Sequence, residues 1–258
     1  MSDIALNGVP ISQRSPEVRA RLIQSTYSWL AVAVAGFAAA SWLLSRAGFG
    51  VAAMNCVAAH KFAWLGVLLA YAALGAICSS MARAGSQGVA ATGLGLAVIL
   101  EALLFSPLIA FVLLKSGAGA VQSAALGTAL LVAALTLVVK VTGHEFSWLR
   151  PFLFVASLLA FGLIVCSILF GFSLGMAFCY AMLALGSAFV LYDTSRVLNE
   201  TTDDTPISAA LELFGSIALV FWYMLRIFGD NGVCAGGDRK STRLNSSHIP
   251  LSRMPSSA

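Results

Sequence analysis

Seven long apolar stretches dominate this chain and limit what it can fold into. They lie at 25–44, 62–82, 89–114, 121–141, 150–171, 175–198 and 206–228. A helix of about 20 residues crosses the ~30 Å hydrocarbon core of a bilayer. Of the 258 residues, 59% are hydrophobic and only 10% are charged, whereas a soluble domain has about 25% charged residues. The sequence therefore predicts an all-α membrane protein with seven transmembrane helices, or six if one short span is re-entrant.

The composition divides the chain into three parts. Residues 1–24 form a polar N-terminal segment, and residues 25–229 form the predicted transmembrane domain. The last stretch, DRKSTRLNSSHIPLSRMPSSA from Asp238 onward, has no helical periodicity and is similar to translated sequencing-adapter read-through. We therefore expect residues 230–258 to be a disordered tail that is foreign to the natural protein from about residue 238.

The distribution of Lys and Arg between the loops favours a cytoplasmic N-terminus. With that orientation the inner side carries Arg14, Arg19, Arg21, Arg83, Lys140, Arg150 and Arg196. The outer side carries Arg46, Lys61, Lys115 and Arg226. Cytoplasmic loops of membrane proteins carry an excess of basic residues, so the seven-to-four distribution predicts that segment 1–24 is cytoplasmic. No apolar core precedes the first span, so we expect no cleavable signal peptide.

Two carboxylates interrupt the last two spans. Asp193 lies five residues before the predicted end of the sixth span, and Glu212 lies six residues after the predicted start of the seventh. Both are therefore about 7–9 Å deep, where an ionisable group is costly and by default marks a functional site. At close range they would share a proton and sense pH, or ligate a cation such as calcium. The alternative is that each is a structural acid near a helix end.

Two further residues extend this pair into a predicted polar track, and a third is a candidate basic partner. Glu101 lies twelve residues into the third span, about 18 Å deep, so we expect it to face the bundle interior. Ser216 follows Glu212 by one helical turn on the same face. Arg83, at the end of the second span, lies at the depth of Asp193 and is a candidate basic partner.

Several classes of protein are disfavoured by the sequence. It contains no HExxH or Walker motif, no histidine within a span, and no Cys/His spacing typical of a metal site. The formal net charge is +4, and four basic residues in the last twenty account for most of it. We therefore predict neither an enzyme nor a nucleic-acid-binding protein, and no cofactor.

Three segments resemble one family of membrane proteins. These are LYDTSRVL at 191–198, AALELFGSIALVFWYMLRIFG at 209–229 and ILEALLFSP at 99–107. They are similar to the Bax inhibitor / YccA (TMBIM) family, and the likeness covers roughly residues 20–230. The resemblance implies a pH-sensitive calcium leak channel in the bacterial inner (plasma) membrane. The alternative, implied by YccA-type members, is a non-transporting modulator of a membrane-bound protease such as FtsH.

The resemblance also implies roles for the polar residues. Channel members pair an Asp of the sixth helix with an Asp of the seventh, and an arginine of the second helix latches the closed state. Asp193 matches the first Asp and Arg83 is the candidate latch, but the second Asp aligns with Ser216 rather than Glu212. We thus expect a pH sensor and gate at Asp193, with Glu212 or Ser216 as its partner. Glu101 would line the pore, and Asp193 and Glu212 would ligate calcium as the transported ion.

Overall fold

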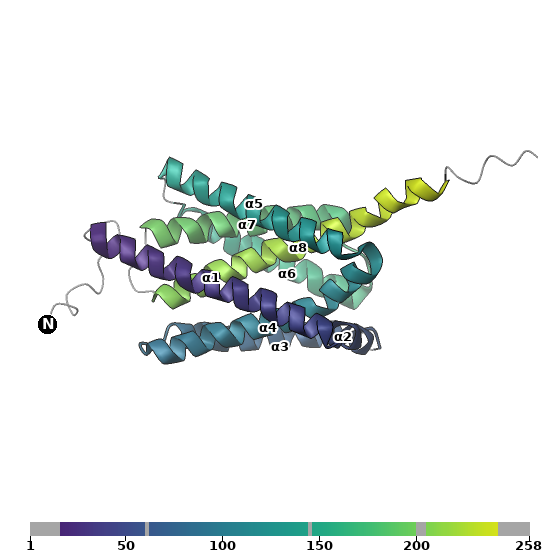
Figure 1. Ribbon diagram of the computed structural model, residues 1–258, viewed down its shortest axis with the longest axis horizontal. Helices are drawn as coiled ribbons and strands as arrows, with labels where there is room; N and C mark the ends of the chain where they lie inside the picture. The colour runs from purple at the N-terminus through teal and green to yellow at the C-terminus, as the bar shows by residue number, and fades with distance from the viewer. Residues whose placement is uncertain (1–15, 60–61, 144–145, 200–204, 242–258) are drawn as a thin grey trace, which may run out of the picture.

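The computed structural model describes residues 16–59, 62–143, 146–199 and 205–241, with the side chains of the last helix described as far as Asp230. The described residues form eight α-helices and no strands (Figure 1). The helices are α1 (Pro16–Arg46), α2 (Phe49–Ala58), α3 (Ala63–Ala82), α4 (Gln87–Ser116), α5 (Ala118–Thr142), α6 (Leu149–Phe170), α7 (Gly175–Asn199) and α8 (Pro206–Ser241). All except α2 are long and apolar enough to cross a membrane. The prediction of seven spans is confirmed.

The first and last spans belong to helices longer than the sequence predicts. Helix α1 begins at Pro16, nine residues before the predicted residue 25. Helix α8 runs to Ser241, so the predicted tail at 230–258 begins within this helix. The residues from 242 onward lie outside those that the structure describes.

Helix α2 lies in the connection at 45–61, where the sequence pattern indicates only a loop. Gly48, with φ of 72°, turns the chain after α1, and the following ten-residue helix is too short to span a bilayer. Helix α2 packs against α4 at Gly50, where a Cβ atom would lie 2.5 Å from the carbonyl oxygen of Ser106. A glycine is therefore required for this close approach.

The spanning helices alternate in direction and so define two sides of the bundle. Helices α1, α4, α6 and α8 begin on the same side, at the left in Figure 1, and α3, α5 and α7 end there. We call this the N-terminal side. The connection between α4 and α5 on the other side is the single residue Gly117, whose φ of 80° is readily adopted only by glycine. That the N-terminal side faces the cytoplasm stays a prediction from the sequence.

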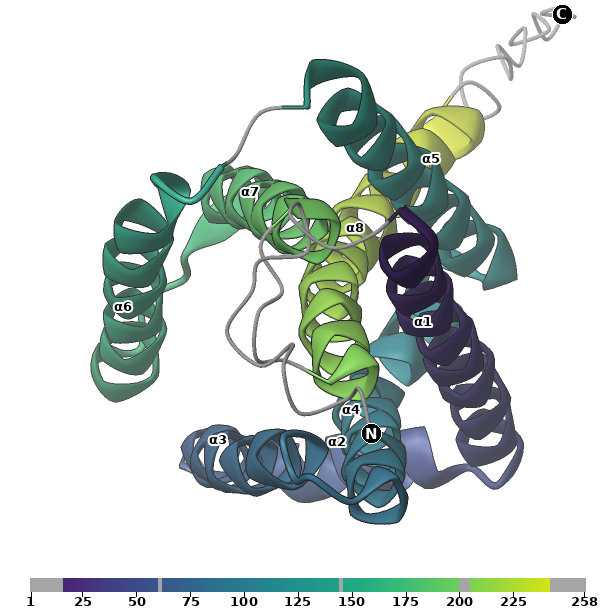
Figure 2. The ribbon, with the colours of Figure 1, turned by 90° about the vertical axis from the view of Figure 1, so that its left-hand side faces the viewer.

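Helices α4 and α8 form the centre of the bundle. In α4 and in α8, half or more of the residues of the apolar 18-residue stretch are buried. In the other spans at most 22% of the corresponding residues are buried. Viewed from the N-terminal side in Figure 2, α8 is surrounded by α7, α5, α1 and α4, whereas α6 lies at the periphery and packs mainly on α7. Because α6 lies at the periphery, a cavity forms between α6, α7 and α8 on the N-terminal side.

Aromatic side chains fill the bundle where α1, α4 and α8 meet. The ring of Phe105 lies 5.1 Å from Phe37, 5.6 Å from Phe221 and 5.0 Å from Trp222, measured between ring centroids. These four residues form what we call the aromatic layer. Edge-to-face and offset-stacked contacts of this kind contribute stabilisation beyond simple area burial. The layer therefore holds α1, α4 and α8 together at the centre of the bundle.

Candidate functional site

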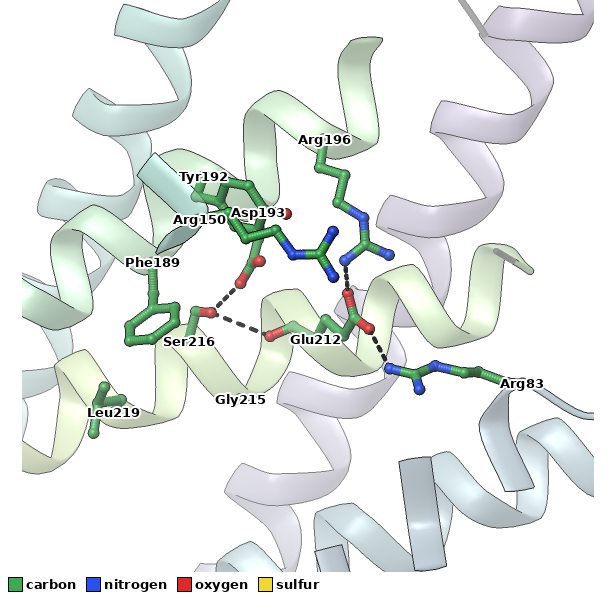
Figure 3. Close-up of a pocket in the computed structure, with 10 residues that line it drawn as sticks. All are labelled: Arg83, Arg150, Phe189, Tyr192, Asp193, Arg196, Glu212, Gly215, Ser216 and Leu219. Atoms are coloured by element: carbon green, nitrogen blue, oxygen red, sulfur yellow. Dashed lines mark hydrogen bonds and ion pairs between the residues drawn. The ribbon is translucent and has the colours of Figure 1, made fainter. Parts of the chain in front are cut away.

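A cavity of about 770 Å³ lies on the N-terminal side, between α6, α7, α8 and the end of α3 (Figure 3). Its charged and hydroxyl-bearing lining consists of Arg83, Arg150, Asp193, Arg196, Glu212 and Ser216, with the phenol of Tyr192. Phe189 and Leu219 are the main apolar part of the wall. Four residues predicted as the sensor and gate are thus brought together at one cavity.

Asp193 lies on the face of α7 that packs against α8, and it is 8% exposed. The hydroxyl of Ser216, also 8% exposed, donates a hydrogen bond to Oδ2 of Asp193. The two helices approach closely two turns away, where Gly186 contacts Val220 and an added Cβ atom would lie 3.1 Å from a methyl group. Because residues seven apart lie on one helix face, Gly186 also brings Asp193 within reach of α8.

Ser216 faces two acceptors at once. Besides Asp193, its hydroxyl lies 3.2 Å from the main-chain carbonyl oxygen of Glu212, one turn earlier in α8. A serine hydroxyl has one proton to donate and two lone pairs with which to accept. It can therefore donate to the carboxylate of Asp193 or to the carbonyl of Glu212, according to which of them needs the proton.

Glu212 binds arginines rather than Asp193. Its Oε1 accepts a hydrogen bond from Nη2 of Arg83 at 3.0 Å, and its Oε2 is ion-paired with Arg196. Figure 3 shows the Glu212 carboxylate lying between these two guanidinium groups. Of the two partners expected for Asp193, it is Ser216 that makes contact. The candidate latch, Arg83, contacts Glu212.

Arg150 and Arg196 also line the cavity, whereas their positions in the sequence indicated only the orientation of the chain. Arg196 follows Asp193 by three residues, which puts both on one side of α7 and is a signal that the sequence does contain. Arg150 lies in the first turn of α6, far in sequence from α7 and α8. Nothing in the sequence alone indicates that its guanidinium points into the cavity, as Figure 3 shows.

Glu101 lies apart from the cavity. It is 7% exposed in α4, and Oε1 accepts a hydrogen bond from the hydroxyl of Tyr71 in α3 at 2.5 Å. The predicted interior position of Glu101 agrees with this burial. However, Glu101 is not among the residues that line the cavity, so a track that joins Asp193 to Glu101 stays a prediction. Tyr71 is a partner that sequence reasoning missed, although a lone tyrosine in an apolar span is a visible signal.

The described residues contain no cluster of three or more His, Cys, Asp or Glu side chains that could hold a metal ion. Asp193 and Glu212 line the same cavity, but arginines occupy both oxygens of Glu212. In this arrangement a calcium ion would find Asp193 as its main carboxylate. A two-carboxylate cation site requires that Glu212 first leave its arginines.

The fold and the cavity define a multi-pass α-helical membrane protein with a buried acid beside a charged chamber on one side. The family model described as "Inhibitor of apoptosis-promoting Bax1" matches residues 19–233. This chain therefore belongs to that Bax inhibitor family, as the segments at 99–107, 191–198 and 209–229 predicted. No curated protein matches it closely enough to be informative.

Proposed function

We propose that this protein is a proton-controlled leak for cations, calcium foremost, and that the arrangement described above is its closed state. The observation that carries this proposal is the buried Asp193, bonded to Ser216, in the wall of a charged cavity. Membership of the Bax inhibitor family supports it. A buried acid in contact with a water-accessible chamber is the usual element of proton-sensitive transport.

Ser216 allows Asp193 to gain or lose a proton without leaving a polar group unpaired. When Asp193 is ionised, Ser216 donates to it. When Asp193 is protonated, its O–H donates to Ser216, and the serine proton turns to the carbonyl oxygen of Glu212, 3.2 Å away. An unpaired buried donor or acceptor costs about 1–3 kcal/mol, so both protonation states are accessible at this position.

Two features close the route across the membrane. Phe221 of the aromatic layer follows Ser216 by five residues of α8, about 7.5 Å further along the helix, and its ring stacks on Phe105. On the cavity side, Glu212 is fixed between Arg83 and Arg196. A hydrophobic constriction next to a charged vestibule excludes hydrated ions.

Opening would require Arg83 to leave Glu212. The Arg83 side chain is 58% exposed, and exposed ion pairs of this kind contribute only about 0–1 kcal/mol. The Arg83 side chain can therefore leave Glu212 at small cost. Glu212 would then join Asp193 in offering hard carboxylate oxygens, which calcium prefers.

The proposal is tested by calcium flux into liposomes that contain the purified full chain and an entrapped indicator dye. Flux of the parent should depend on pH across the neutral range. The Asp193→Asn variant has no ionisable group at this position, so its calcium flux should lose most of the pH dependence. Glu212→Gln should weaken the arginine contacts and raise the flux while keeping a pH dependence.

The matched control is Glu17→Gln, an exposed acid at the start of α1. Its flux should follow the parent at every pH. Parent-like pH dependence of the flux in Asp193→Asn would contradict the proposed sensor. Absence of calcium flux in the parent at any pH would contradict the leak itself.

A second candidate function is the restraint of a membrane-bound protease, such as FtsH, without transport. The observation that favours it is the extension of α1 to Pro16, which presents exposed Glu17 and Arg21 beyond the predicted start of the first span. Co-purification of the full chain with membrane proteases tests this function. Loss of capture on removal of residues 1–19 would support it, and unchanged capture would assign any contact to the bundle.

A further inference from the structure

Three arginines from three different helices converge on the cavity. Arg83 follows α3, Arg150 begins α6 and Arg196 ends α7, and all three line the same space. Figure 3 shows the guanidinium groups of Arg150 and Arg196 both pointing into it. Like charges held close together are unfavourable. Their convergence therefore calls for negative charge in the cavity.

The two described acids that line the cavity, Asp193 and Glu212, meet this need incompletely. Glu212 contacts Arg83 and Arg196, and Asp193 takes its hydrogen bond from Ser216. Within the part of the chain that the structure describes, the Arg150 side chain has no hydrogen bond or ion pair. The wall thus carries three guanidinium groups against two carboxylates, with one guanidinium unused.

We infer that this cavity binds the phosphate group of an anionic ligand, with Arg150 as its principal contact and Arg83 and Arg196 as supporting contacts. This goes beyond the proposed leak. A guanidinium presents a planar fork of donors that matches phosphate oxygens in pairs. Basic pockets between membrane helices are typical sites for phospholipid head groups.

The apolar part of the wall indicates what else the ligand carries. Phe189 and Leu219 lie beside the charged groups, so the cavity suits a ligand that joins a phosphate to hydrocarbon. An anionic phospholipid has this chemistry, and a soluble phosphate ester has the charged half of it. The cavity volume of about 770 Å³ is in the range of small-molecule sites.

Glu212 competes with such a ligand for two of its three arginines. A phosphate that engages Arg83 and Arg196 must take hydrogen bonds that Glu212 now accepts. Removal of the Glu212 charge should therefore tighten binding, whereas removal of the Arg150 charge should weaken it. Glu212→Gln and Arg150→Gln are therefore expected to change the affinity for the phosphate ligand in opposite directions.

The test is a binding measurement on the purified full chain in a neutral detergent. The probes are dihexanoyl phosphatidylglycerol and sn-glycerol 3-phosphate, titrated by calorimetry into the parent, Arg150→Gln and Glu212→Gln. Hydrogen bonds to charged groups predict roughly ten- to hundred-fold weaker binding for Arg150→Gln. Glu212→Gln should bind several-fold more tightly than the parent. The control, Arg21→Gln, removes an exposed arginine of α1 on the same side and should bind as the parent does.

The outcomes separate the two sources of phosphate. Binding of the lipid probe alone assigns the site to a membrane head group, and equal binding of both probes assigns it to a soluble ester. Failure of the parent to bind either probe overturns the inference, as does parent-like affinity of Arg150→Gln. If Arg150→Gln does not fold, the gain of affinity in Glu212→Gln still decides, because unfolding cannot produce a gain. No ion gradient is present, so failure here leaves the proposed leak standing, and failure of the leak leaves this site standing.

Discussion

Asp193 and Glu101 are two buried acids with similar immediate surroundings and different access. Asp193 is 8% exposed and accepts a hydrogen bond from the hydroxyl of Ser216. Glu101 is 7% exposed and accepts one from the hydroxyl of Tyr71. Asp193 lines a cavity with three arginines, whereas Glu101 lies outside that cavity. Burial and a hydroxyl partner are thus common to the proposed sensor, Asp193, and to an acid away from the cavity, Glu101. Contact with a charged chamber distinguishes the two.

The largest expected effect on stability comes from the enclosed acid. Tyr71→Phe removes the hydroxyl bonded to Glu101 and leaves a buried carboxyl without that partner. We expect a loss of about 1–3 kcal/mol in the free energy of unfolding, measured by denaturant titration in mixed micelles. Tyr180→Phe is the control, because Tyr180 is 53% exposed on α7. Equal free energies of unfolding for Tyr71→Phe and Tyr180→Phe would show that water replaces the Tyr71 hydroxyl. Glu101 would then be as accessible to water as Asp193.

A smaller loss is expected when the acid beside the cavity loses its partner. Ser216→Ala removes the hydroxyl bonded to Asp193, but a water molecule in the cavity can replace it at little cost. We expect the free energy of unfolding to fall by less than about 1 kcal/mol. The pH dependence of flux should nevertheless shift, because the two bonding patterns of Ser216 are lost. Ser187→Ala, which removes a hydroxyl bonded within α7, should leave that dependence unchanged.

The smallest effect on stability is expected at the exposed ion pair. Arg83→Gln leaves Glu212 bound to Arg196, and pairs exposed to this degree contribute about 0–1 kcal/mol. The free energy of unfolding should therefore be nearly unchanged, while calcium flux should rise because Glu212 loses one of its two arginines. Arg46→Gln on the other side is the control. A stability loss as large as that of Tyr71→Phe would mean that Arg83 is a structural residue and no latch.

The architecture was largely predictable from the sequence, because hydrophobic length alone determines membrane spans. Helix α2 was missed because ten residues cannot span a bilayer and the glycines at its start, Gly48 and Gly50, are typical of a loop. The contact between Asp193 and Ser216 agrees with the alignment of the seventh span. The arginine partners of Glu212 were harder to predict. Arg83 lies 129 residues away in sequence, and only the folded arrangement of α3 beside α8 brings it near.

The bond between Asp193 and Ser216 has a consequence for the biogenesis of the protein. During synthesis, α7 leaves the ribosome before α8 and carries Asp193 without the hydroxyl that satisfies it. An acid alone in lipid is costly, so α7 is poorly suited to enter the bilayer by itself. Insertion of α7 and α8 together as a helical hairpin would bury the acid and the serine at the same moment. The residues that tune the finished protein would thus also set the order in which its last two helices reach the membrane.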